Sequence, residues 1–281
     1  MIKCALVTGT STGIGLETAV ALANAGFSVV ATMRDLTRRG RLDARASELG
    51  VTMDVRELDV QDDASVNACV RGVLAQYTRV DLLVNNAGAG YLGALEQTSD
   101  ETMRRMMDVN FFGVWRVTRA LLPSMRRAGQ GHIVTVTSIG GLLGQPFNDA
   151  YCASKFAVEG FMESLAPVAE RIGIHISLIE PGAVHSEFVA SVMDTREFLT
   201  PELHGAYGGM LNAYTKAAEE AYAVSGQTSA HVAACIVDVA TTASPHFRYQ
   251  TSEMIRGFVA RKFVDPTGDS VVKLSGARLS S

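Results

Sequence analysis

CALVTGTSTGIGLETAVALANAG, residues 4–26, places an apolar run, a glycine-rich turn and a helical pattern in direct succession. Glycines at positions 9, 13 and 15 allow a tight turn, a close approach of backbone to phosphate, and close packing of helix against strand. The amino end of the following helix would face that negative charge. The context is typical of a dinucleotide-binding turn, although the spacing G-x-x-x-G-x-G differs from G-x-G-x-x-G.

The alternative is a glycine-rich turn between strand and helix that binds no ligand. Its place after the first strand of a predicted parallel sheet favours a ligand. The residues expected to contact a dinucleotide here are Gly9, Ser11, Thr12, Gly13, Ile14 and Gly15.

Apolar runs that predict strands recur along the chain, each separated from the next by enough residues for a helix. They cover residues 2–7, 27–32, 51–60, 80–85, 132–138 and 175–180. Continuous apolar runs are typical of strands buried on both faces, and alternation with helices is typical of parallel pairing. The sequence therefore predicts an α/β fold with a doubly wound parallel sheet of the Rossmann type.

The length and pattern predict one domain over residues 1–281. A chain of 281 residues with 47% apolar residues can bury a full core, and no low-complexity linker interrupts it. Residues 186–226 are predicted to be a helical insertion, which either packs on the core or forms an apolar lid over a substrate. Residues 251–281 are a C-terminal extension.

The stretch 248–263 predicts an amphipathic helix, which could pack against a second subunit or a membrane surface. Its mixed charge favours the subunit contact, and we expect a homodimer or homotetramer.

Composition excludes several classes of partner. The net charge of -4, without a basic stripe interleaved with aromatic residues, argues against nucleic acid. No run of 18 apolar residues is present, so no integral membrane segment is predicted. Four single cysteines without a nearby histidine cluster indicate neither a metal site nor disulfides, and they fit a reducing, cytoplasmic location.

The end of the second predicted strand bears on the choice of cofactor. An NAD site is expected to carry Asp or Glu about 20 residues after the glycine turn, to hold the ribose hydroxyls. The strand here ends ATMRD, with Met33 in that place and Arg34 after it. A guanidinium pairs well with a 2′-phosphate, so NADP(H) is favoured over NAD(H). Asp35 would be the ribose acid if the alignment were one or two residues out.

The arginines of this segment have a second interpretation, because Arg34, Arg38, Arg39 and Arg41 could form a solvated charge run.

Further along the chain, Asp59 and Val60 could contact the adenine. The NNAG stretch places small residues beside the cofactor, and we expect contacts from Asn86, Ala87 and Gly88. Either segment could instead only form a turn and make no contact with a cofactor.

Tyr151 and Lys155 lie four residues apart on a predicted helix and so share a face. Ser138 closes the strand predicted over 132–138, where an open parallel sheet presents groups to its crevice. Lowering the pKa of a phenol from about 10 by roughly two to three units needs about 3 to 4 kcal/mol. One positive charge at about 4 Å supplies that order of energy at an effective dielectric constant of about 20. Lys155 could therefore poise Tyr151 for proton exchange with an alcohol or carbonyl, with Ser138 holding the same oxygen.

Each of these three residues alone is usually structural, and their joint order after a glycine turn is what favours catalysis. The sequence resembles the short-chain dehydrogenase/reductase family through TGTSTGIG, NNAG, MDVNFFG, Ser138, YCASK and PGAVHSEF, over about residues 3–190. The resemblance implies a Rossmann-type sheet and hydride transfer from a nicotinamide.

The same resemblance implies roles for individual residues. Tyr151 would be the acid/base, and Lys155 would also bind the nicotinamide ribose. Ser138 would orient the substrate, and Asn110 would hold a water that continues the proton relay; from the residues alone, Asn110 could equally be a helix interruption. Further nicotinamide contacts are implied for Pro181, Gly182 and Val184.

A closer likeness in ATMRDL, YCASKFAVEGFMESLAP and HISLIEPGAVHSEF points to the branch that holds 17β-hydroxysteroid dehydrogenase type 1 and retinol dehydrogenases. That branch implies NADP(H) and a bulky apolar alcohol, ketone or aldehyde. The expected function is thus an NADP(H)-dependent oxidoreductase for an apolar substrate. The rivals are a non-catalytic nucleotide sensor and a sugar-nucleotide epimerase, which would be expected to carry a larger C-terminal domain.

Overall fold

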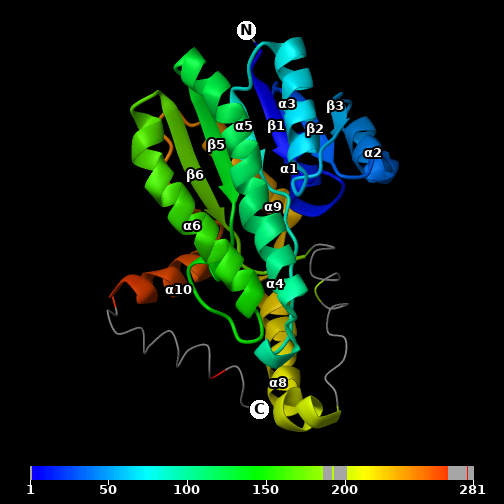
Figure 1. Ribbon diagram of the computed structural model, residues 1–281, viewed down its shortest axis with the longest axis vertical. Coiled ribbons are helices and arrows are strands. Elements are labelled where there is room, and N and C mark those ends of the chain that lie inside the picture. Colours follow the sequence, from blue (N-terminus) through cyan, green and yellow to red (C-terminus); the bar gives the residue numbers. More distant parts are fainter. Residues whose placement is uncertain (1, 186–191, 193–200, 265–276, 278–281) are drawn as a thin grey trace.

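The computed structural model describes residues 2–185, 192, 201–264 and 277. Its centre is a sheet of seven strands, in which every neighbouring pair is parallel (Figure 1). In sheet order the strands are β3 (Asp54–Glu57), β2 (Ser28–Met33), β1 (Cys4–Thr8), β4 (Leu82–Asn85), β5 (Gly131–Val136), β6 (Ile174–Glu180) and β9 (Arg248–Gln250). The direction of winding reverses between β1 and β4, which confirms the predicted Rossmann-type fold.

Helices cover both faces of this sheet. On one face α3 (Asp63–Tyr77), α5 (Gly113–Ala128) and α6 (Asp149–Glu170) lie side by side (Figure 1). On the other face are α1 (Gly13–Asn24), α2 (Gly40–Glu48) and α9 (Ser229–Thr241). Successive residues of β1 serve opposite layers, since Leu6 packs with α3 and α5 whereas Ala5 and Val7 pack with α1 and α9. Burial on both faces explains why the strands appear in the sequence as continuous apolar runs.

The remaining elements connect these layers or stand beyond the carboxyl ends of the strands. They are η1 (Leu36–Arg39), η2 (Leu95–Gln97), α4 (Asp100–Met107), the π-helical turn η3 (Asp108–Phe112), η4 (Ile139–Gly141), α8 (Pro201–Ser225), α10 (Glu253–Val264) and the short parallel pair β7 (Val184–His185) and β8 (Gln227–Thr228). Among the described residues, no helix has both the length and the apolar character that crossing a bilayer requires.

The structure corrects several predicted element boundaries. The run 51–60 forms a strand only over Asp54–Glu57, because the Asp59 side chain accepts a hydrogen bond from the Gln61 backbone and starts a turn. The helix predicted over 248–263 begins only at Glu253, since Arg248–Gln250 pair with β6 as an edge strand. Ser138 lies two residues beyond the end of β5 rather than closing that strand.

The two special segments are described in part. The insertion contains a helix, α8, over Pro201–Ser225, while positions 186–191 and 193–200 lie outside the described residues. Of the C-terminal extension, 265–276 and 278–281 also lie outside them. Part of the apolar surface of α10 packs within the same chain, where Ile255 and Val259 cluster with Leu142 and Leu143, while Phe263 is exposed. A contact of this helix with a second subunit stays a prediction.

Candidate active site

The predicted site residues meet beyond the carboxyl ends of the central strands, where open parallel sheets bind ligands. The glycine turn follows β1, Arg34 follows β2, NNAG follows β4, Ser138 follows β5 and Pro181 follows β6. Within the described residues, no group of three or more His, Cys, Asp or Glu side chains is arranged to hold a metal ion.

The glycine turn has the geometry that its sequence predicts. Gly9 and Gly13 adopt φ values of +71° and +60°, which side chains rarely adopt. A Cβ atom on Gly9 would lie 2.8 Å from the Cα of Ala87, and one on Gly15 would lie 2.2 Å from the Gly9 carbonyl oxygen. The turn can therefore be made only with glycine at these positions, and it leaves the amino end of α1 open to a phosphate.

The NNAG segment is tied to the glycine turn. The Asn86 amide nitrogen Nδ2 donates to the Thr8 and Gly9 carbonyls at 2.9 and 3.1 Å. The Thr8 hydroxyl accepts from the backbone nitrogens of Asn86 and Ala87 at 2.9 and 3.0 Å. The Asn86 side chain thus holds the loop together, a supporting role that the sequence did not indicate.

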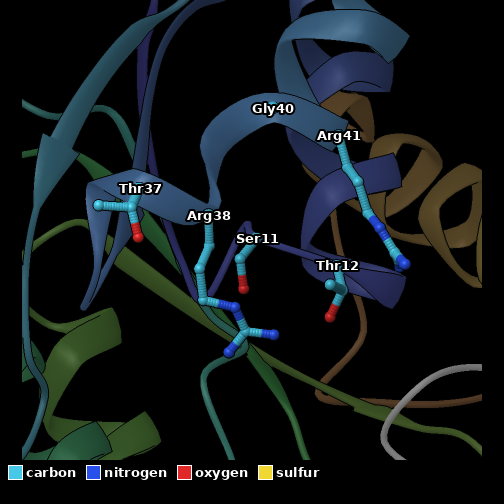
Figure 2. A pocket seen from close by; sticks show the side chains of 6 residues that line it. All are labelled: Ser11, Thr12, Thr37, Arg38, Gly40 and Arg41. Carbon is cyan, nitrogen blue, oxygen red and sulfur yellow. The ribbon is translucent and has the colours of Figure 1, made fainter.

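An open cavity of about 360 Å³ lies between the glycine turn and η1 (Figure 2). It is lined by Ser11, Thr12, Thr37, Arg38, Gly40 and Arg41. Figure 2 shows the Arg38 guanidinium below the Ser11 hydroxyl and the Arg41 side chain extending towards Thr12. The arginines lining this cavity are thus Arg38 and Arg41, whereas Arg34 is exposed at the end of β2 and is not part of its wall.

The carboxylate of Asp35 has local partners. It accepts hydrogen bonds from the Thr37 backbone nitrogen at 2.9 Å and from the Thr37 hydroxyl at 2.6 Å, and so caps η1. These hydrogen bonds lower the pKa of Asp35. A carboxylate engaged in this way is poorly placed to hold ribose hydroxyls.

Asp59 and Val60 take part in the turn before α3. Besides the bond from Gln61, the Asp59 backbone nitrogen donates to the Ser65 hydroxyl at 3.0 Å. The Val60 carbonyl accepts from Arg116 at 3.1 Å, and its side chain fills the space beside Gly113. Asp59 and Val60 therefore form a turn, which was one of the two interpretations that the sequence left open for them.

The Ser138 hydroxyl lies beside the Tyr151 hydroxyl and acts to lower the pKa of the phenol. The Ser138 oxygen also accepts from the Gly140 backbone nitrogen at 3.0 Å, so its own hydrogen remains to be donated. The Ile139 nitrogen donates to the Pro181 carbonyl at 2.9 Å, which fixes this loop against the end of β6. The hydroxyls expected to hold a substrate oxygen therefore come together on one rigid support.

Lys155 is buried, and its amine Nζ donates to the Val136 carbonyl at 3.1 Å. The amine lies 5.9 Å from the centre of the Tyr151 ring. Burial lowers the pKa of Lys155 to about 8, although Glu159 opposes this change. The two side chains share a face of α6, as predicted.

The expected lowering of the Tyr151 pKa is not found. Burial raises the pKa of Tyr151 above its ordinary value, and the nearby Ser138 hydroxyl opposes this rise without reversing it. A single charge at about 4 Å would lower this pKa, but the cost of removing a phenolate from water is larger here.

Asn110 lies in the π-helical turn η3, between α4 and α5, and is fully buried. Its Oδ1 accepts from the Ala89 nitrogen at 2.8 Å, and its Nδ2 donates to the Ala89 carbonyl and the Ser154 hydroxyl, each at 2.9 Å. A Cβ on Gly88 would lie 3.1 Å from Oδ1 of Asn110 and 3.7 Å from Nζ of Lys155. Asn110 is thus a helix interruption, and its side chain comes close to the Lys155 amine across Gly88.

The insertion and the C-terminal helix border this site. On α8, Leu211 and Tyr214 pack on Leu92, and the Tyr214 hydroxyl accepts from Asn148 at 3.0 Å. This part of α8 packs on the loops after β4 and η4, away from the main core. At the other end of the site Ile255 of α10 fills the space above Gly182, where a Cβ would approach it to 2.3 Å.

Three charged residues near the site were missed by the sequence analysis. Glu159 lies one turn after Lys155 on α6, Glu180 ends β6 just before Pro181, and Arg248 starts β9. All three meet in the interior. The available signal was the i, i+4 spacing of Lys155 and Glu159 and an acidic residue in the apolar run HISLIE.

The parallel sheet and its loops define a Rossmann-type protein with Ser, Tyr and Lys gathered beside a glycine-rich turn. The family model described as short chain dehydrogenase matches residues 3–197 of this chain. The chain belongs to the short-chain dehydrogenase family.

The similarity to individual relatives extends beyond residues 3–197. Bovine retinol dehydrogenase 8 is 43% identical over 281 residues, covering 97% of this chain and 89% of that protein. Human 17-beta-hydroxysteroid dehydrogenase type 1 is 38% identical over 273 residues, covering 95% of this chain and 83% of the relative. The branch suggested by the sequence motifs is confirmed.

Solved structures agree with the fold. A short-chain dehydrogenase from Streptomyces avermitilis is similar with a TM-score of 0.79 at 30% identity, over 98% of this chain and 97% of that one. An alcohol dehydrogenase from Thermococcus sibiricus complexed with 5-hydroxy-NADP gives 0.72 at 25%, over 89% and 96%. A short-chain dehydrogenase/reductase from Burkholderia phymatum in complex with NAD gives 0.78 at 26%, over 92% of each chain. Neighbours of this chain thus bind either dinucleotide.

Proposed function

We propose that this protein is an NADP(H)-dependent oxidoreductase that interconverts an apolar alcohol and its ketone or aldehyde. The observation that carries the proposal is the Ser138 hydroxyl beside Tyr151, with the buried Lys155 amine 5.9 Å from the centre of the Tyr151 ring. The names of the retinol and steroid dehydrogenase relatives support an apolar substrate.

The residues present fit a dinucleotide. Positive φ angles at Gly9 and Gly13 and the contacts that exclude a side chain from Gly15 shape a cradle at the amino end of α1. The cofactor contacts we propose are Gly9, Ser11, Thr12, Gly13, Ile14, Gly15, Arg34, Asp59, Val60, Asn86, Ala87, Gly88, Tyr151, Lys155, Pro181, Gly182 and Val184. When bound, the nicotinamide supplies or accepts the hydride.

The side chains supply proton transfer and orientation. In reduction, Tyr151 donates its proton to the carbonyl oxygen while Ser138 donates a hydrogen bond to the same oxygen. A raised Tyr151 pKa suits this direction, because the phenol stays protonated at neutral pH. The Lys155 ammonium stabilises the phenolate that remains, and Asn110 lies next to Lys155 on the route by which a proton returns.

The arginines after β2 support NADP(H) over NAD(H). Arg34 follows the strand directly, and Arg38 faces Ser11 across the cavity, so a 2′-phosphate could receive charge-assisted hydrogen bonds from either guanidinium. Asp35, the acidic residue nearest to the position where NAD enzymes hold ribose, is engaged with Thr37.

The first test is cofactor oxidation followed by absorbance, with steroid ketones, retinal and simpler aliphatic and aromatic carbonyls. We expect turnover of the bulky apolar carbonyls with NADPH, and a kcat/KM with NADH lower by about 10-fold or more, as loss of a charge-assisted contact implies. Tight NADPH binding without turnover of any carbonyl would instead support a nucleotide-sensing protein.

Matched arginine variants complete that test. Arg34→Asp and Arg38→Asp are expected to reverse or abolish the NADPH preference, since each replaces an attractive charge with a repulsive one. Arg39→Asp is the control, because the Arg39 guanidinium already pairs with Asp43 at 2.7 Å on the exposed side of η1. An unchanged preference in Arg34→Asp would remove Arg34 from the phosphate site.

We also propose a homodimer, formed through α6 and the turn η3 that precedes α5. Phe112 at the end of η3 and Phe156 of α6 are exposed, and the rings of Phe111 and Phe161 beside them pack together at 5.9 Å. Sedimentation should give twice the chain mass, and Phe112→Glu should shift the protein towards a monomer. A wild-type protein that sediments as a monomer at micromolar concentration would overturn this proposal.

A further inference from the structure

An arginine and three glutamates form a charged cluster beneath the candidate site, named here the Arg248 cluster. Its members are Glu159 and Glu163 of α6, Glu180 of β6 and Arg248 of β9. Arg248 contacts Glu159 and lies 2.9 Å from Glu180 and 2.6 Å from Glu163. The Gln250 side chain donates to the second oxygen of Glu180 at 2.5 Å.

This cluster is attached to the candidate site along the chain at two points. Glu159 lies one helical turn from Lys155, and Glu180 precedes Pro181. Gly141 of η4 packs on Glu159, since its Cβ position is 2.9 Å from Cγ and 3.3 Å from Oε1 of that side chain.

The buried charges of the Arg248 cluster do not balance by themselves. The side chains of Glu159 and Glu180 are 5% and 0% exposed, whereas that of Glu163 is 67% exposed. Arg248 offers one positive charge to two buried carboxylates. Among the described residues, Oε1 of Glu159 has no hydrogen-bond donor. An unpaired buried charge is costly, so a second buried cation nearby stabilises the set.

Lys155, one helical turn from Glu159, is the buried cation, with an exposed fraction of 5%, whereas Lys262 of α10 also acts on Glu159 but is only partly buried. We infer that Glu159, held in place by Arg248, is a positioning residue that keeps the Lys155 amine charged at the catalytic centre. This inference rests on the proposed function, for which the charged amine is needed.

The electrostatic environment agrees with this assignment. Burial lowers the pKa of Lys155 to about 8, and Glu159 is the group that opposes this change. Burial also raises the pKa of Glu159, while Arg248 acts in the opposite direction. The charged and polar groups that face Glu159 are Lys155 and Glu163 of α6, Thr137 after β5, Glu180 of β6, Arg248 of β9 and Lys262 of α10.

The charge of Lys155 can be measured without any turnover. The lysines of this chain are Lys3, Lys155, Lys216, Lys262 and Lys273, so a protein labelled with ¹³C and ¹⁵N at lysine gives few signals, and Lys155→Arg assigns one of them. Nuclear magnetic resonance titration should place the Lys155 midpoint near pH 8 in the wild type. In Glu159→Gln we expect a midpoint lower by about one pH unit, because one nearby negative charge is lost.

Glu163→Gln is the matched control, since it removes a carboxylate from the same arginine and the same helix. Its exposure screens the charge, so the Lys155 midpoint should move by less than about 0.3 units. Glu159→Asp keeps the charge and should restore most of the wild-type midpoint, which guards against a Gln variant that folds poorly. Equal midpoints in wild type and Glu159→Gln would overturn the inference.

The pH profile of activity tests whether the charge that Glu159 maintains on Lys155 is needed for the reaction. Because Lys155 loses its proton before Tyr151, the alkaline limb of kcat/KM should follow Lys155. In Glu159→Gln this limb should move down by about one unit, which lowers kcat/KM about fivefold at pH 8 and little at pH 6. A uniform loss at all pH values would contradict the inference and indicate only a structural role. If no carbonyl is reduced by the wild type, the proposed function fails, while the titration still decides the charge of Lys155.

Discussion

Tyr151→Phe is expected to lower kcat/KM for carbonyl reduction by about 1,000-fold, within the range that one general acid contributes. The ring and its packing are kept, and only the hydroxyl that meets Ser138 is lost. Because the change removes an interaction made with the reacting oxygen, kcat should fall while the Kd of NADPH stays within about threefold. Steady-state NADPH oxidation and fluorescence titration of NADPH measure the two quantities.

A second phenol provides the control. The Tyr77 hydroxyl donates to Asp54 at 3.2 Å at the far end of α3, outside the candidate site, so Tyr77→Phe should reduce substrate at nearly the wild-type rate. If Tyr151→Phe retained more than about a tenth of the wild-type kcat/KM, Tyr151 could not be the acid in the proposed reaction. Loss of NADPH binding together with activity would show that the Tyr151 hydroxyl acts mainly as a cofactor contact and not as the acid.

The fold was predictable because its signals are local. Each buried strand appears as an apolar run, and Gly9, Gly13 and Gly15 occupy positions at which a side chain would collide or be strained. The sequence also allowed one site to be predicted for Ser138, Tyr151 and Lys155, because the carboxyl ends of parallel strands lie at the same edge of the sheet.

What the sequence did not predict depends on distant segments. Strand β9 is three residues long, RYQ, with no apolar run, and it is defined only by pairing with β6. Arg248 therefore could not be placed beside Glu159 and Glu180, which precede it by 89 and 68 positions. The pKa of Tyr151 was misjudged for a related reason, since desolvation depends on all surrounding atoms and not on one helical neighbour.

The arginines after β2 illustrate the same limit. Sequence spacing favoured Arg34 for the 2′-phosphate, and the cavity beside Ser11 is lined by Arg38 and Arg41. The turn η1 causes this difference, because the Asp35 cap reverses the chain and brings Arg38 back towards the glycine turn. An arginine four residues further along can thus share the site with the one at the strand end.

Gly15→Ala is expected to destabilise the protein by about 2–3 kcal/mol, the cost of overpacking a rigid site. Its Cβ would lie 2.2 Å from the Gly9 carbonyl oxygen and 2.3 Å from Nδ2 of Asn86. These two atoms are joined by a hydrogen bond of 3.1 Å, so the new methyl group would have to separate them. Because Asn86 also holds Thr8, the whole glycine turn would shift at the amino end of α1.

The same shift should weaken NADPH binding by about 10-fold or more, since the backbone amides that face the phosphates would lose their alignment. Urea unfolding gives the stability change, and fluorescence titration gives the Kd. Gly160→Ala is the matched control, because it lies inside α6 with nothing within 4 Å of its Cβ position. There alanine should raise the free energy of unfolding by about 0.5–1 kcal/mol through helix propensity and leave the Kd unchanged. Wild-type stability and affinity in Gly15→Ala would show that the turn can relax, and the close packing of Gly9, Gly15 and Asn86 would then not be what shapes the cofactor cradle.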